Sequence, residues 1–291
     1  MTNFPLKISA LYRWYDPDLE KFSIYCQSAG DFPFQTLDSI SMTRMAEDAG
    51  LFRKINRIAN ENGLIFRDAH SPWGESWDLN ELTTPERIER QKNLLRQLAE
   101  AGTVKTYTIH QGAMWCYRNE YRGNEEKVRA ITDHAVEQLL GTLEDTGIIL
   151  AVENCFEPST TARLAVDLLK RFDHPQLGLC LDVGHANLME PRERDISRMV
   201  DYIRAAWQPE QPSFTPGIPE LMAPDLVTVH LHDNDGYNDL HRAPGNSGTV
   251  DWQRYVSVIK SAPRLISIQS EIEYKDRFPL KETLALQELF A

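Results

Sequence analysis

The last third of the chain contains an apolar run that ends in alternating imidazole and carboxylate groups, Val229-His230-Leu231-His232-Asp233. A short apolar run is typical of a buried β-strand, and ionisable residues directly after it would lie at the end of that strand. Imidazole nitrogens and carboxylate oxygens are common ligands of divalent metal ions in proteins. This segment therefore predicts a strand that brings metal ligands to the rim of a sheet, and hence an enzyme.

The same pattern recurs upstream and downstream, where other apolar runs end in a single His, Asp or Glu. These residues are His70, His110, Glu153, Asp182 and Glu271. A single ionisable residue at a strand end is usually exposed and needs no function. Together with His230 there are six such ends in one chain, and this repetition indicates a shared site.

Short β-rich runs alternate with amphipathic helical stretches along the chain. We expect strands over Leu6–Tyr12, Phe34–Ile40, Leu64–His70, Thr103–His110, Ile148–Glu153, Leu177–Asp182, Leu226–His230 and Arg264–Glu271. We expect helices over Ala46–Asn62, Pro85–Ala101, Glu125–Thr146, Thr161–Phe172, Arg192–Trp207, Trp252–Ser261 and Leu280–Phe290. The proline-rich stretch Gln208–Pro224 is predicted to be an irregular connector on the face away from the site.

This alternation predicts an α/β protein, a (β/α)₈ TIM barrel whose single domain spans residues 1–291. A doubly wound open sheet is the second architecture. It would require a glycine-rich phosphate-binding turn after the first strand, and Leu11-Tyr12-Arg13-Trp14 contains no glycine. In a barrel, all six ionisable strand ends would meet at the carboxyl-terminal rim, where barrel enzymes carry their chemistry.

The composition limits the partners. The formal net charge is −12 and basic residues are not clustered, which disfavours nucleic acid. Four separated cysteines indicate free thiols in a reducing compartment. The N-terminal residues lack the pattern of a signal peptide, and no apolar run is long enough for a membrane span. We therefore expect a cytoplasmic protein that binds neither nucleic acid nor a membrane.

The ends of the fifth to eighth strands supply the predicted metal ligands, which are Glu153, Asp182, His230 and Glu271. Four such groups would enclose one divalent ion and leave positions for a substrate. Glu273 would share a strand face with Glu271, so the last ligand could lie two residues further on. We favour Glu271 because it directly follows the apolar run.

These segments resemble the xylose-isomerase-like barrel superfamily of sugar phosphate isomerases and epimerases, which also includes endonuclease IV. The resemblance extends from about Leu64 to Glu271 and rests mainly on Asp182-Val183-Gly184-His185 and His230-Leu231-His232-Asp233, with support from Gly245-x-x-Gly248-Thr249-Val250-Asp251-Trp252. In the keto-sugar epimerases, positions matching the four predicted ligands hold one Mn, Zn, Co or Mg ion, and the position matching His185 contacts a substrate oxygen.

The resemblance implies a metal-dependent isomerase or epimerase acting on a sugar or keto-sugar, phosphorylated or not, through a metal-stabilised enediolate. Glu153 and Glu271 would be the acid and base, and His185 would orient the substrate. In the relatives, residues matching His70, His110, Asp239 and His241 line the pocket, and we add His232 and Trp115 as expected substrate contacts. The aromatic residues Trp73, Trp77, Trp115 and Tyr117 could stack on a sugar or pack under loops.

Two other activities remain open. Endonuclease IV binds three zinc ions through a nine-residue set that this chain matches with His70, His110, Glu153, Asp182, His185, His230, Asp239, His241 and Glu271. A sugar dehydratase or lyase is the other alternative. The epimerases also have a sugar-binding arginine where this chain has Gly236, and Arg242 or Arg118 could replace it. A barrel without catalysis is disfavoured because no ligand is replaced. Relatives often form dimers or tetramers, which leaves a homo-oligomer open.

Overall fold

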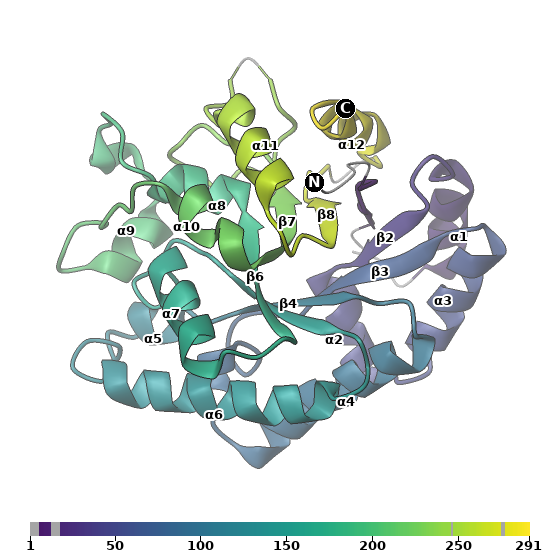
Figure 1. Cartoon of the computed structure of the whole chain (residues 1–291), viewed down its shortest axis with the longest axis horizontal. Helices are drawn as coiled ribbons and strands as arrows, with labels where there is room; N and C mark the ends of the chain where they lie inside the picture. Colours follow the sequence, from purple (N-terminus) through teal and green to yellow (C-terminus); the bar gives the residue numbers. More distant parts are fainter. Residues whose placement is uncertain (1–5, 13–17, 246, 275–276) are drawn as a thin grey trace.

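The computed structural model describes residues 6–12, 18–245, 247–274 and 277–291. Eight parallel strands form one sheet in sequential order, and Figure 1 shows helices packed around it. A parallel bridge between Ser9 and Gln269 joins the first strand to the last, so the sheet closes into a barrel. The strands are β1 (Ala10–Tyr12), β2 (Phe34–Leu37), β3 (Ile65–His70), β4 (Thr106–His110), β5 (Ile149–Glu153), β6 (Leu177–Asp182), β7 (Leu226–Leu231) and β8 (Ser267–Ser270).

The fold prediction, a (β/α)₈ barrel, is confirmed. The longer helices that follow the strands are α1 (Leu19–Ser28), α2 (Ser39–Glu47), α3 (Leu51–Glu61), α4 (Pro85–Ala101), α6 (Glu125–Leu143), α7 (Ala162–Phe172), α11 (Trp252–Ser261) and α12 (Leu280–Glu288). Shorter ones are α5 (Met114–Tyr117), α8 (Val183–Met189), α9 (Asp201–Trp207) and α10 (Ile218–Met222). Within the described residues, no helix combines the length and apolar character needed to cross a bilayer.

Local sequence signals explain the regular helices. The hydroxyl of Thr84 caps α4, Pro85 occupies its first turn, and Gly102 ends it in a left-handed conformation. In α6, Val128, Ala135 and Leu139 are buried at helical spacing and face the barrel. The predicted bounds of α11 are confirmed, and Asp251 caps this helix by accepting a hydrogen bond from the backbone of Arg254.

The predicted helix Ala46–Asn62 is wrong in its extent. The structure has α2 and α3 there, with a break between them where the Asp48 carboxylate accepts a hydrogen bond from the Gly50 amide. The predicted helix Arg192–Trp207 shortens to α9, preceded by a single 3-10 turn at Ile196–Arg198. The connector Gln208–Pro224 includes α10, which the prolines had concealed. Arg13 and Trp14, used above to exclude a phosphate-binding turn, lie outside the described residues.

The interior of the barrel is polar beneath the carboxyl-terminal rim. Asp68 is fully buried, forms an ion pair with Arg67 and accepts a hydrogen bond from Thr106 at 2.6 Å. Gln269 donates to the hydroxyl of Thr228 at 2.8 Å. Because each of these groups has a partner, the layer can lie in the core at little cost, and it supports the ionisable groups above it.

Candidate active site

His230 lies at the centre of three carboxylates on the barrel rim. Its Nδ1 is 3.1 Å from Oε1 of Glu271, 3.5 Å from Oε2 of Glu153 and 4.0 Å from Oδ2 of Asp182. All four side chains are buried, and among the described residues this nitrogen has no hydrogen-bond partner. The four residues predicted as metal ligands therefore converge on one point, and it is Glu271, and not Glu273, that lies beside His230.

Strand register produces this convergence. Asp182 on β6 pairs with His230 on β7, and His110 on β4 pairs with Glu153 on β5. Residues paired in this way lie side by side on neighbouring strands. Asp182 also caps α8 through a 2.6 Å hydrogen bond from the His185 amide, so the same carboxylate places His185 next to the group.

Glu153 is the residue that contacts most of the imidazoles. Its Oε2 lies 3.1 Å from Nε2 of His70 and 3.3 Å from Nε2 of His110, and its Oε1 lies 3.4 Å from Nδ1 of His185. Together with His230, four imidazoles surround one carboxylate that is 1% exposed. A buried carboxylate in such surroundings is stable only because positive charge is close to it.

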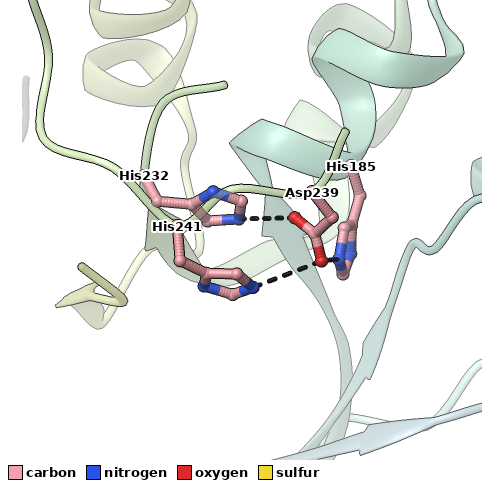
Figure 2. A group of neighbouring side chains, drawn as sticks. All are labelled: His185, His232, Asp239 and His241. Atoms are coloured by element: carbon pink, nitrogen blue, oxygen red, sulfur yellow. Dashed lines mark hydrogen bonds and ion pairs between the residues drawn. The ribbon is translucent and has the colours of Figure 1, made fainter. Parts of the chain in front are cut away.

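A second cluster joins the first through Asp182. The Asp239 carboxylate lies between His185, His232 and His241 (Figure 2), with Oδ2 3.3 Å from Nε2 of both His185 and His241. Nε2 of His232 is 3.8 Å from Oδ1 of Asp239 and 3.0 Å from Oδ1 of Asp182. The ligand atoms of these four residues lie within 4.8 Å of one another, so they too could hold a cation.

The two clusters form the floor of a cavity of about 580 Å³. Most of the predicted site residues line it, namely His70, His110, Glu153, His185, Asp239, His241 and Glu271. Asp182, His230 and His232 are buried beneath these groups and are not among the described lining residues. Trp115, which was predicted to contact substrate, is not among the described lining residues, and its buried indole donates to the Asn80 carbonyl.

Burial and opposite charges together determine the ionisation of the site. Burial opposes ionisation of Glu153, but His230 and His110 outweigh it and hold the pKa of Glu153 well below its usual range. Burial disfavours protonation of His241, but Asp239 prevails and raises the pKa of His241 to about 9. By the same opposition, Asp182 and Asp239 raise the pKa of His185 well above its usual value. Near neutral pH, the positive charge of the protonated imidazoles thus offsets the negative charge of the carboxylates.

The donor set fits a divalent cation. Three ionised carboxylates face a nitrogen that has no hydrogen-bond partner, and a bound cation would neutralise the carboxylates and use that nitrogen's lone pair. Protons and cation compete for the same atoms, since an imidazole must be neutral to ligate.

The cavity also contains residues that sequence reasoning missed. Asp78 is 2% exposed and burial raises its pKa to about 7, while Glu157 accepts a 2.9 Å hydrogen bond from the Tyr117 hydroxyl. Both follow strands by several residues, within loops whose path no periodicity reveals. Neither Arg118 nor Arg242, the proposed replacements for a sugar-binding arginine, is among the described lining residues. Arg118 instead forms an ion pair with Glu81 at 2.7 Å.

A family model described as a xylose isomerase-like TIM barrel matches residues 29–289. No curated protein sequence matches the chain. Among solved structures, a D-psicose 3-epimerase with D-tagatose from Clostridium cellulolyticum H10 is 14% identical, with a TM-score of 0.65 and 98% of each chain covered. The apo form of a 3-keto-D-glucoside 4-epimerase from E. coli is 17% identical, with a TM-score of 0.62 and coverages of 98% and 99%. An AP endonuclease, family 2, from Brucella melitensis is 16% identical, with a TM-score of 0.65 and coverages of 97% and 98%. At these identities the likeness establishes the fold.

Proposed function

Because the chain belongs to the xylose isomerase-like TIM barrel family, we propose that it is a divalent-metal-dependent isomerase or epimerase of a sugar or keto-sugar. The observation that carries this proposal is the convergence of Glu153, Asp182 and Glu271 on Nδ1 of His230 at the floor of a cavity. Hydroxyl-rich ligands suit such a floor, since it offers both donors and acceptors. The proposed partner is thus a small-molecule sugar.

Glu153, Asp182, His230 and Glu271 would hold one divalent ion. When bound there, the ion would act as a Lewis acid towards sugar oxygens. The mixed nitrogen and oxygen donors suit Mn, Zn, Co or Mg.

The chain's own carboxylates would move the proton next to the sugar carbonyl. Glu153 and Glu271 both line the cavity, and each has two oxygens, so one oxygen can be a ligand while the other accepts or returns a proton. In Glu271, Oε1 faces His230 whereas Oε2 lies 3.7 Å from Nδ1 of His241. His185 lines the cavity, with Nε2 3.3 Å from Oδ2 of Asp239 and Nδ1 3.0 Å from the Asn154 carbonyl, and would contact the sugar and fix its orientation.

The test is hydrogen exchange at carbon. The metal-loaded protein is incubated in D₂O with a panel of ketoses and aldoses, and NMR follows deuterium uptake and the appearance of the isomer. We expect uptake with at least one sugar, loss of it in Glu271→Gln, and retention in Glu273→Gln, the matched carboxylate two residues on. A metal-loaded protein that exchanges no sugar proton would contradict the proposal, and loss of water from the sugar would indicate a lyase instead.

A second candidate, a zinc phosphodiesterase, is favoured by one observation. The groups around Glu153, His230 and Asp239 together contain all nine residues that resemble the three-zinc set. Metal analysis after gentle purification separates the candidates, because about one equivalent per chain favours the isomerase and three zinc ions favour the nuclease. Cleavage of a plasmid with abasic sites would then support the nuclease directly.

A further inference from the structure

The cavity contains a buried carboxylate that has no cationic partner. Glu157, which follows β5, is 5% exposed and lines the cavity. Its Oε1 accepts a 2.9 Å hydrogen bond from the Tyr117 hydroxyl, and its Oε2 accepts one of 2.8 Å from the Thr160 hydroxyl. Within the described residues, Glu157 forms no ion pair with Lys, Arg or His. Burying an ionised carboxylate is costly unless it is paired, so a ligand that brings a positive charge would be favoured beside it.

Imidazoles offset other carboxylates of the cavity but are not paired with Glu157. The imidazoles that line the cavity lie against Glu153, Asp239 and Glu271, at the distances given above. A bound metal ion would displace protons from the imidazoles that ligate it, so the floor keeps its own balance of charge. The described ionisable lining residues are Asp38, Asp78, Glu153, Glu157, Asp239, Glu271, His70, His110, His185 and His241. Neither Lys nor Arg is among them, so the charge of Glu157 has no counter-ion there.

Asp78 adds an unsatisfied acceptor to the same cavity. This residue is 2% exposed, and its Oδ1 has no hydrogen-bond partner among the residues that the structure describes. Nδ1 of His110 is 3.9 Å from this oxygen, which is beyond hydrogen-bonding distance. Burial raises the pKa of Asp78 to about 7, and Glu157 contributes to the rise, so Asp78 is partly protonated at neutral pH. A buried oxygen without a partner in a cavity indicates a ligand that donates a hydrogen bond.

Aromatic rings lie close to these two carboxylates. Tyr117 on α5 and Tyr202 on α9 line the cavity, and α5 packs against α9. The centroid of the Phe156 ring is 5.6 Å from that of Tyr202 and 5.1 Å from that of His185, so the rings extend from the floor outwards. Burial raises the pKa of Tyr202 to about 12, and nearby carboxylates, including Glu157, add to the rise. Aromatic faces attract cations, so rings beside a carboxylate suit an organic ammonium ion.

We propose that the substrate is an amino sugar, whose ammonium group binds at Glu157 beside the rings of Tyr117 and Tyr202. This inference rests on the proposed function for the role of the floor and adds the substrate class. An amino sugar keeps its carbonyl, so the proton transfer on the floor is unchanged. An ammonium group donates three hydrogen bonds, of which Glu157 can accept one and Oδ1 of Asp78 a second.

Binding of matched probes tests the proposal without requiring turnover. Titration calorimetry of the Mn²⁺-loaded protein at pH 7 compares hexoses and ketohexoses with their amino-deoxy derivatives, which carry the amine at C1, C2 or C3, and with the N-acetylated forms. We expect at least one amino sugar to bind about tenfold more tightly than its parent sugar, as one hydrogen bond between charged groups would give. N-acetylation removes the charge and should abolish this gain.

Two variants and a control locate the effect. Glu157→Gln keeps the shape of the side chain without its charge and should bring the ratio of amine to parent affinity close to one. Tyr202→Leu removes a ring that is 42% exposed and should lower the ratio about threefold. Glu81→Gln is the matched control, because Glu81 is 2% exposed but pairs with Arg118 and is not among the described lining residues. It should keep the ratio.

Three results would overturn the inference: no amino sugar binds more tightly than its parent, the N-acetylated form binds as tightly as the amine, or the ratio persists in both Glu157→Gln and Tyr202→Leu, which would place the amine on the metal ion. Circular dichroism of each variant ensures that a lost ratio is not lost folding. If Glu157→Gln does not fold, Tyr202→Leu and the N-acetylated probes still decide. The proposed function fails separately, when no sugar exchanges its proton with D₂O, whatever the ratio of affinities.

Discussion

Removal of the Glu153 charge should destabilise the metal-free protein in a manner that depends on pH. In Glu153→Gln, the side chain keeps its shape but no longer offsets the charge of the imidazoles of His70, His110, His185 and His230. Truncating one partner of a buried charge pair commonly costs ~3–5 kcal/mol, because the remaining charge loses its partner.

The pKa shift of one imidazole, that of His110, gives the size of this destabilisation. Burial alone would lower the pKa of His110, but Glu153, and after it Asp78, raise that pKa to about 9. Relative to an unfolded value of ~6.5, this shift corresponds to ~3 kcal/mol of folding free energy. Because the folded-state pKa is the higher one, the contribution is complete below pH ~6.5 and is lost as the pH rises through about 9. Through His110, Glu153→Gln should therefore cost up to ~3 kcal/mol near pH 6, and this part of the cost should fall below ~1 kcal/mol near pH 10.

Urea unfolding in the presence of EDTA measures both free energies, and equal m-values show that the unfolded states are comparable. Asp68→Asn is the matched control. Asp68 is equally buried, but its partner is Arg67, whose charge persists at both pH values, so its cost should be the same at pH 6 and pH 10. A cost of Glu153→Gln that is also constant would refute the view that this carboxylate stabilises imidazolium ions.

Three further outcomes follow from the same geometry. The metal-free protein should be most stable near pH 6 and lose stability towards pH 9, because His110 and His241, whose pKa values are both raised to about 9, stabilise the fold only while they are protonated. Added metal should raise the Tm more at pH 8 than at pH 6. His230→Ala should weaken metal binding by more than the ~10–100-fold loss that is typical when a residue that hydrogen-bonds to a ligand is removed. Competition with a chelator measures this affinity, and His134→Ala, on the exposed face of α6, should leave it unchanged. Gly184→Ala should destabilise the fold by ~1–3 kcal/mol in urea, because its Cβ would lie 1.9 Å from Cε1 of His232; Gly141→Ala within α6 meets no atom within 4 Å and should be neutral or stabilising.

The sequence predicted where ligands would gather because strand ends and barrel topology are linked. Once the runs ending at Glu153, Asp182 and His230 are taken as neighbouring parallel strands, their last residues must share one rim. Strand interiors show this signal because they are buried and apolar. The exact register was not predictable in this way, because the pairing of β6 with β7 shifts by one residue between Leu179 and Cys180 before it brings Asp182 beside His230.

Elements buried on all sides could not be found in the same way. Every residue of α8 from Val183 to Met189 is buried, so the helix has no polar face and produces no amphipathic pattern. Its N-terminal cap, Asp182, serves at the same time as the end of β6 and as a predicted metal ligand. Because Asp182 has these three roles, no change in the periodicity of the sequence marks the boundary between β6 and α8.

The aromatic residues close to the cavity show a different limit. Trp115 and Tyr117 both lie in α5, yet only Tyr117 is among the described lining residues. Residues two apart on a helix point in different directions, so proximity to a strand end does not decide which aromatic residue reaches the cavity. Tyr202 comes from α9, whose start at Asp201 lies well inside the longer predicted helix.

The second cluster depends on a loop that returns to the rim, and the glycine motif near residue 248 explains its path. Asp233 and Arg242 exchange two backbone hydrogen bonds, which close the loop carrying Asp239 and His241. The Asp233 carboxylate accepts a 3.0 Å bond from Trp252 Nε1 and lies where a Cβ on Gly248 would be, 2.0 Å from Oδ2. A side chain at position 248 would thus displace Asp233, and with it the closure that places Asp239 between His185 and His241. The geometry of the second cluster therefore depends on this small residue as well as on Asp239 and its histidine partners.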